Sequence, residues 1–293
     1  MHPGEIEQVR RFNRTVTQRV GALSDRFLAR DRPLSEARML WEIGSEGCEV
    51  RALRNRLELD SGHASRLLRA LEADGLVCIE PTPSDRRVRM ARLTRAGLAE
   101  RAMLDERSDD LAASMLDPLE DGQRERLVDA MRTVERLLTR SAVEIRKTDP
   151  NHPDARQCVR AYFAELDRRS DSDLSSDDTL PTQPDELRPP AGQFLVAYLH
   201  GEPVGCGGVK HHADGVSELK RIWVSESARG LGLGRRILGE LESLAGDHGA
   251  KRIRLDTNRN LVEAIAMYRS AGYCEIPAFN DEPFAHHWFE KRG

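Results

Sequence analysis

The 293-residue sequence predicts two domains: a mainly helical domain over residues 1–142, followed by an α/β layer domain over residues 143–293. In the first half, apolar residues recur at three- and four-residue steps, which is typical of amphipathic helices. In the second half, strand-like segments alternate with helix-like ones, which is typical of a sheet layered with helices. The halves also differ in composition, because no lysine precedes Lys147 although arginine is abundant.

Composition and charge argue against several classes of protein. Charged residues make up 32% of the chain but the formal net charge is only −4, so a nucleic-acid-binding surface has to be a local patch. The five cysteines are scattered and form no Cys-x-x-Cys pair, which supports neither a zinc site nor a disulfide framework. The sequence lacks both the apolar run of a signal peptide and the roughly 20 apolar residues that span a bilayer. We therefore expect a cytoplasmic protein with no bound metal and no membrane partner.

The first domain is predicted to begin with one long helix, because an apolar stripe runs from Ile6 to Phe27. Three shorter helices and two strands are expected next, over residues 34–43, 50–57, 60–74, 76–79 and 88–93. Gly75 is expected to end the fourth helix, and residues 81–85 have the composition of a turn. Long amphipathic helices then continue from Thr94, a predicted cap, to about residue 142.

An arginine-rich stretch coincides with the fourth helix and the strand hairpin. Residues 51–95 contain ten arginines and six acidic residues, so this stretch is net positive. Arginine suits phosphate and base-edge contacts because its planar fork donates parallel hydrogen bonds. The candidate DNA contacts on the helix and in the turn are Ser61, His63, Ser65, Arg66, Arg69, Arg86 and Arg87.

This region resembles the MarR family of bacterial regulators. The family's wing commonly reads Asp-x-Arg, then a strand and Leu-Thr, which Asp85, Arg87, Leu93 and Thr94 match. The resemblance implies a winged helix-turn-helix that binds double-stranded DNA, as a homodimer joined through its long first and last helices. Recognition helices would enter successive major grooves, and Arg87 the adjacent minor groove. The alternative is that these arginines are solvated surface residues.

The second domain is predicted to contain strands over residues 143–146, 193–198, 204–210, 219–224, 252–256 and 287–290. Its helices are expected over residues 154–168, 234–248 and 261–271. The acidic segment 170–190 is interpreted as a loop inside this domain, because the strand and helix before it already look like the domain's start. The alternative is a linker between the domains.

A glycine-rich loop, Arg229-Gly-Leu-Gly-Leu-Gly234, lies between a predicted strand and a predicted helix. Glycines let backbone N–H groups converge, and the start of a helix attracts negative charge, so the loop suits a pyrophosphate. The dinucleotide motif Gly-x-Gly-x-x-Gly fails, because Arg235 and Ile237 stand where its last glycine is required. The nucleotide P-loop also fails, because two arginines follow Gly234 instead of Lys and Ser or Thr.

Residues 218–273 resemble the core of the GNAT family of N-acetyltransferases. The family's loop, Gln/Arg-x-x-Gly-x-Gly/Ala, is matched by Arg229, Gly232 and Gly234, and its Tyr-x-x-x-Gly-Tyr/Phe pattern begins at Tyr268. The resemblance implies an acyltransferase fold with a central mixed sheet and acetyl-CoA as cosubstrate. The cofactor contacts that it implies are Ile222, Val224, Arg229, Gly230, Leu231, Gly232, Leu233, Gly234, Arg235 and Asn260.

The same resemblance implies two catalytic residues. Tyr268 would protonate the leaving thiolate, and Glu218 would accept a proton from the attacking amine, directly or through water. The expected protein is a bifunctional transcriptional regulator and N-acetyltransferase, in which the amine of a small molecule or a protein attacks the thioester directly. Two alternatives stay open: a regulator whose second domain is a non-catalytic acyl-CoA or ligand sensor, and an enzyme whose helical half only dimerises.

Overall fold

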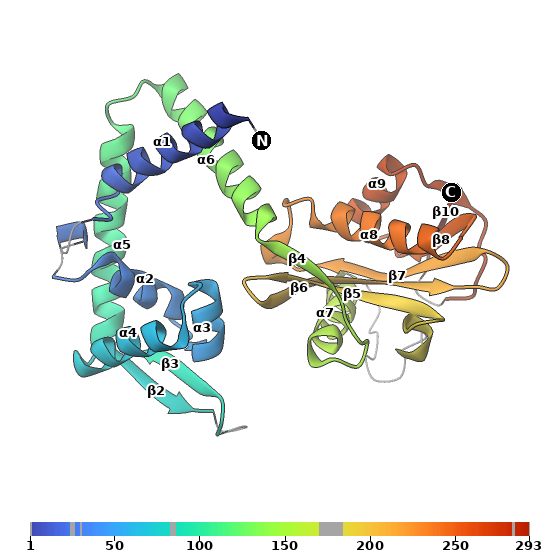
Figure 1. The fold of residues 1–293 in the computed structure, drawn as a ribbon, viewed down its shortest axis with the longest axis horizontal. Coiled ribbons are helices and arrows are strands. Elements are labelled where there is room, and N and C mark those ends of the chain that lie inside the picture. Colours follow the sequence, from blue (N-terminus) through green and yellow to red (C-terminus); the bar gives the residue numbers. More distant parts are fainter. Residues whose placement is uncertain are drawn as a thin grey trace. The chain divides into compact units, whose positions relative to one another are not determined.

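The computed structural model describes residues 2–23, 27–29, 31–82, 86–169, 184–282 and 285–292. The chain divides into two compact units, Met1–Met131 and Arg132–Gly293. The elements of each unit are labelled in Figure 1. The domain boundary expected after residue 142 stays a prediction. In the described ranges, no helix is both long enough and apolar enough to cross a bilayer.

The first unit is mainly helical, as predicted. Its helices are α1 (Pro3–Arg19), η1 (Phe27–Ala29), α2 (Leu34–Ile43), α3 (Val50–Arg56), α4 (Ser61–Ala73), α5 (Arg95–Leu116) and α6 (Asp121–Ser141), the last of which continues into the second unit. Its strands are β1 (Cys48–Glu49), β2 (Val77–Pro81) and β3 (Arg89–Leu93), and they pair antiparallel in the order β1-β3-β2. The sequence did not predict the short strand β1.

Local chemistry sets the ends of these helices. The Asp60 side chain accepts a hydrogen bond from the His63 N–H at 2.8 Å and so caps α4. Thr94 caps α5 as predicted, accepting from the Gly97 N–H at 3.1 Å. The apolar faces of α2 and α4, including Leu40 and Leu71, are buried in one core with β2 and β3.

The prediction that the first helix continues to Phe27 is wrong. Helix α1 ends at Arg19, and the N–H of Ala22 then bonds to the carbonyl of Thr17 at 3.2 Å. Gly21, with φ +67°, takes the left-handed conformation that ends many helices. Phe27 belongs instead to the buried core, where its ring meets Trp41 edge to face. The spacing of apolar residues had joined two separate elements.

The second unit is a seven-stranded sheet in the order β4-β5-β6-β7-β8-β10-β9. Its strands are β4 (Val143–Lys147), β5 (Gly192–Leu199), β6 (Glu202–His211), β7 (Val216–Val224), β8 (Arg252–Thr257), β9 (Cys274–Ile276) and β10 (His287–Arg292). Only β7 and β8 pair in parallel among these described neighbours, so the sheet is mixed, as expected. The sequence did not predict β9.

Helices cover both faces of this sheet. They are α7 (Pro153–Arg169), η2 (Pro184–Leu187), η3 (Glu226–Ala228), α8 (Leu233–Asp247) and α9 (Val262–Ser270). Figure 1 shows α8 and α9 on one face and α7 on the other. Successive residues of a strand point to opposite faces, so Leu195 of β5 packs in the core with α8, while Phe194 and Val196 pack with α7.

The parallel strands β7 and β8 separate halfway along β7. They pair from Val216 opposite Arg252 to Leu219 opposite Leu255, whereas β7 continues to Val224 beside β6 alone. At the point of separation Arg221 has φ +56°, and the register with β6 shifts there. One edge of the last residues of β7 is therefore free of β8, and the sheet is open at this place.

Candidate functional site

A cavity of about 710 Å³ lies where β7 and β8 separate, lined by residues of α7, β7, the glycine-rich loop, α8 and α9. Eight of the predicted cofactor contacts line it: Ile222, Val224, Arg229, Gly230, Gly232, Leu233, Gly234 and Arg235. Leu231 and Asn260 are not among its lining residues. The Asn260 amide instead donates to the Arg169 carbonyl at 2.7 Å, and Leu261 lines the cavity. The structure thus brings most of the predicted loop to one cavity.

The loop needs glycine for two physical reasons. Gly230 and Gly232 have φ values of +78° and +73°, a conformation that side chains disfavour. At Gly234 a Cβ atom would lie 3.2 Å from the Met267 sulfur, which is tighter than ordinary contact. Gly232 is the N-cap of α8 and has no side chain to bond the first N–H groups of the helix. These groups, at the positive end of the helix dipole, suit an anionic ligand.

A buried carboxylate holds this loop to α7. Glu165 is 6% exposed, and both of its oxygens accept from Arg229 Nη2, at 2.5 and 2.6 Å. Trp223 Nε1 donates to the same carboxylate at 2.8 Å. Arg169 forms an ion pair with Glu165 at 3.0 Å and another with Glu263 of α9 at 2.9 Å. One carboxylate therefore connects α7 to the end of β7 and the start of the loop.

Further arginines surround the loop. Arg140, in the last turn of α6, has its Nη1 3.7 Å from where a Cβ of Gly232 would lie. The Arg140 carbonyl accepts from Arg236 at 3.4 Å, and Arg235 hydrogen-bonds to the Ser270 hydroxyl. Within the described ranges, Arg140, Arg235 and Arg236 form no ion pair with an acidic side chain. This excess of positive charge, together with the helix N-terminus, fits a ligand with several phosphate oxygens.

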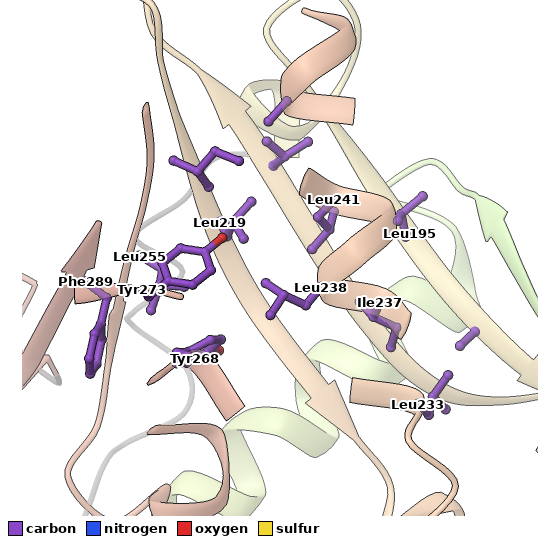
Figure 2. Close-up of a cluster of buried hydrophobic side chains, with 14 of the residues drawn as sticks. Leu195, Leu219, Leu233, Ile237, Leu238, Leu241, Leu255, Tyr268, Tyr273 and Phe289 are labelled. Atoms are coloured by element: carbon purple, nitrogen blue, oxygen red, sulfur yellow. The ribbon is translucent and has the colours of Figure 1, made fainter. Parts of the chain in front are cut away.

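Tyr268 lies in the hydrophobic core. It is 5% exposed, and its ring packs 6.0 Å from that of Tyr273 and 6.1 Å from that of Phe289 (Figure 2). Burial raises the pKa of Tyr268 well above the usual range of a phenol, so its hydroxyl stays protonated. Tyr268 is not among the residues that line the 710 Å³ cavity. Its predicted catalytic role stays a prediction.

Glu218 lines a different cavity, of about 620 Å³, with several other charged side chains. Its carboxylate is 2.7 Å from Lys220 Nζ and 3.0 Å from His212 Nε2. Burial opposes ionisation, but the charge and hydrogen bond of Lys220 and then His212 outweigh it and lower the pKa of Glu218. Lys220 also pairs with Asp256 at 2.8 Å and with Glu282 at 3.3 Å. Glu218 is thus an ionised carboxylate at the edge of a charged cavity.

The predicted DNA contacts lie in the first unit. Ser61, Ser65, Arg66 and Arg69 are exposed on α4, and His63 is half-buried there. Arg86 and Arg87 are exposed in the β2–β3 turn, whereas Asp85 lies outside the described residues. An exposed helix followed by a strand hairpin that carries arginine is the arrangement of a winged helix-turn-helix.

Comparison with protein families assigns both halves. A MarR family model matches residues 31–88, and the model of the acetyltransferase (GNAT) family matches residues 158–273. The chain is a MarR–GNAT fusion. Its winged helix-turn-helix and its mixed-sheet acyltransferase fold confirm the predicted fold class.

Individual relatives of the fusion in the comparisons are acetyltransferases. The chain is 36% identical over 94 residues to the IAA acetyltransferase of Azospirillum brasilense. This match covers 32% of this chain and 61% of that relative, so the chain spans less than two thirds of the relative's length. It is 33% identical over 109 residues to an uncharacterised N-acetyltransferase of Schizosaccharomyces pombe, 36% of this chain and 67% of that relative. Among solved structures, the PaiA N-acetyltransferase from Thermoplasma acidophilum in complex with coenzyme A has a TM-score of 0.44 and 18% identity, over 52% of this chain and 99% of that chain.

Among the residues that line the cavity of the GNAT domain and were not predicted are three with polar groups on one helix: Tyr162, Glu165 and Arg169. All three lie on α7, on the face that also carries the buried Ala155 and Cys158. Their spacing of three and four residues was the available signal, because it places polar side chains on the stripe that faces the sheet.

As to metals, no cluster of three or more His, Cys, Asp or Glu side chains suited to an ion occurs in the described part of the fusion.

Proposed function

We propose that the GNAT domain transfers the acetyl group of acetyl-CoA to an amine, and that the MarR-like domain binds double-stranded DNA as a homodimer. One observation carries the enzymatic part: the glycine-rich loop and the free edge of β7 line the same cavity. Neither feature alone would select this cosubstrate. A pyrophosphate site next to an open strand edge suits a molecule with a diphosphate and an extended amide-containing arm.

In this proposal the N–H groups of residues 229–234 bind the pyrophosphate of coenzyme A. Arg229 and Arg235 supply positive charge there, and Arg140 and Arg236 add to it. The free edge of β7 at Ile222 and Val224 pairs with the pantetheine arm, as a strand edge pairs with an extended peptide. When bound, acetyl-CoA supplies an acetyl group activated as a thioester.

The reaction joins the amine nitrogen to the acetyl carbon and breaks the carbon–sulfur bond, so the nitrogen loses a proton and the sulfur gains one. Glu218 is the proposed acceptor of the amine proton, through water, since its lowered pKa keeps it ionised at neutral pH. Tyr268 is the proposed proton donor to the thiolate, on the strength of the sequence pattern. The charged cavity around Glu218 is the proposed place of the acceptor amine, of a small molecule or a protein.

The proposal for the MarR-like domain rests on α4 and the β2–β3 turn. Their exposed arginines suit phosphates and base edges, and α4 is the proposed recognition helix. The homodimer is proposed to form through α1 and α6, which expose a set of large apolar side chains: Ile6, Val9, Phe12, Val16, Met131, Val134, Leu137 and Leu138.

An acetyl-transfer assay with a panel of primary amines, read as thiol release, tests the enzymatic part. Calorimetric titration with coenzyme A accompanies it. Binding together with amine-dependent thiol release supports the proposal. Tight binding without release from any amine favours a regulator whose GNAT domain is a sensor, and no binding overturns the site itself. Gel shifts with promoter DNA, with and without acetyl-CoA, test the MarR-like domain.

A further inference from the structure

Two large cavities of the second unit are linked through a small third one. A small cavity of about 60 Å³ shares lining residues both with the 710 Å³ cavity of the glycine-rich loop and with the 620 Å³ charged cavity. The small cavity shares Lys220 and Glu282 with the charged cavity. It shares Tyr162 with the cavity of the glycine-rich loop. Tyr162 thus marks the junction between the proposed cosubstrate site and the route to the proposed acceptor site.

The position of Tyr162 on α7 is held from both sides. One turn further along, Glu165 bonds to Trp223 and Arg229. Phe163, which follows Tyr162 in the sequence, has the Arg221 guanidinium over its ring, 5.8 Å from the centroid. Both contacts tie α7 to β7 where β7 has left β8. The Tyr162 ring is therefore beside the free edge of β7, where the pantetheine arm that carries the thioester is proposed to lie.

The Tyr162 hydroxyl is a protonated donor with a free hydrogen. Burial, and next the Asp256 carboxylate, raise the pKa of Tyr162 well above the usual range, although Arg221 and Lys220 act in the opposite direction. No group in the described ranges hydrogen-bonds to this hydroxyl. A neutral phenol that faces two cavities and has no protein partner is available to a ligand.

We propose that Tyr162 is a further catalytic residue of the acetyl transfer, whose hydroxyl donates a hydrogen bond to the thioester sulfur. This inference rests on the proposed function. As the carbon–sulfur bond breaks, negative charge develops on the sulfur, and a donor placed there stabilises it. At the end of the reaction the sulfur is a thiol, so the proton that the sulfur gains balances the proton that the amine nitrogen loses. Tyr268 lines none of the three cavities, and it keeps its separate proposed role of giving the thiolate a proton once the carbon–sulfur bond has broken.

The experiment compares Tyr162→Phe with the parent in binding coenzyme A and desulfo-coenzyme A, which lacks the sulfur. A donor to the sulfur favours the thiolate, so in the parent the preference for coenzyme A should rise with pH between 7 and 10. In Tyr162→Phe we expect this preference to be lower by about tenfold at the alkaline end, with unchanged affinity for the desulfo compound. In the transfer assay, kcat of this variant should fall about 100-fold.

Tyr198→Phe is the matched control, because it removes a hydroxyl that bonds to Asp154 outside the three cavities. It should leave both measurements unchanged. The inference is overturned if Tyr162→Phe keeps the pH-dependent preference, if it weakens both ligands equally, or if Tyr268→Phe alone removes the preference. Coenzyme A binding without acetyl transfer would refute the proposed enzyme, yet the two-ligand comparison would still decide the role of Tyr162.

Discussion

The buried Glu165 carboxylate accepts hydrogen bonds from Arg229 at 2.5 and 2.6 Å. Glu165 lies on α7 and Arg229 opens the glycine-rich loop, so this pair joins two walls of the 710 Å³ cavity. The Glu165 carboxylate is only 6% exposed, and a buried charge is costly unless it is paired. The ion pair with Arg229 is therefore costly to break. The shape of the loop therefore depends on α7, a helix far from it in the sequence.

Substitution Glu165→Gln should weaken acetyl-CoA binding. The amide keeps an acceptor for Trp223 but loses the charge that holds Arg229 and Arg169, so the start of the loop becomes less ordered. We expect KM for acetyl-CoA to rise about tenfold, which corresponds to about 1.4 kcal/mol. The change in kcat should be smaller. Glu226→Gln is the control, because Glu226 is exposed and its ion pair with Arg229 is long, at 4.0 Å. Equal effects of the two substitutions would contradict the role of Glu165.

Gly232→Ala should weaken coenzyme A binding, because alanine at φ +73° costs about 1–2 kcal/mol. The loop is expected to relax and its N–H groups to diverge. Gly239→Ala, in the interior of the same helix and with open space around the new methyl, should instead raise Tm and leave binding unchanged. Titration calorimetry and thermal unfolding of the pair check this. Unchanged affinity of Gly232→Ala would argue against the loop as the pyrophosphate site.

Stability should depend on Glu218 at acid pH. Because its folded pKa is lowered, the ionised carboxylate stabilises the fold above the unfolded value of about 4.3, and this contribution is lost as the pH falls further. Glu218→Gln removes that dependence. Urea unfolding at pH values from 3 to 7 should therefore show a steeper loss at the acid end for the parent than for the variant. Parallel curves would show that Glu218 has no lowered pKa.

Arg66→Ala and Arg87→Ala should each weaken binding to a specific operator. The expected loss is about 1–3 kcal/mol for each arginine that contacts a base. Arg126→Ala, on α6 in the same unit, removes an equal charge away from α4 and the turn. Gel shifts at fixed salt should leave this control close to the parent. Identical affinities for the parent, the control and both variants would remove α4 and the turn from the DNA interface.

Phe12→Glu should disrupt the proposed homodimer. Phe12 is 43% exposed on α1, and a charge placed in an apolar interface is costly to bury. Light scattering at micromolar concentration should give the mass of one chain for the variant and of two for the parent. Arg14→Gln, which loses only an exposed ion pair with Glu7, should keep the mass of the parent. A parent that is itself monomeric would exclude the dimer.

Most elements of the fold followed from local patterns. The predicted helix over residues 34–43 has the observed bounds Leu34–Ile43, because an apolar stripe defines it without help from other elements. The long first helix failed because apolar spacing alone does not detect the left-handed turn at Gly21. The short strand β9 was missed because its three residues carry no pattern of their own, and pairing with β10 defines it.

The candidate site divides in the same way. The sequence by itself determined the glycine-rich loop and the families of both halves, because glycine spacing and the tyrosine pattern are read along the chain. Only the tertiary structure decided that Glu165 meets Arg229, that Tyr162 stands between two cavities, and that Tyr268 packs in the core. These contacts depend on where α7 crosses the sheet and where β7 leaves β8, which no short stretch of sequence specifies.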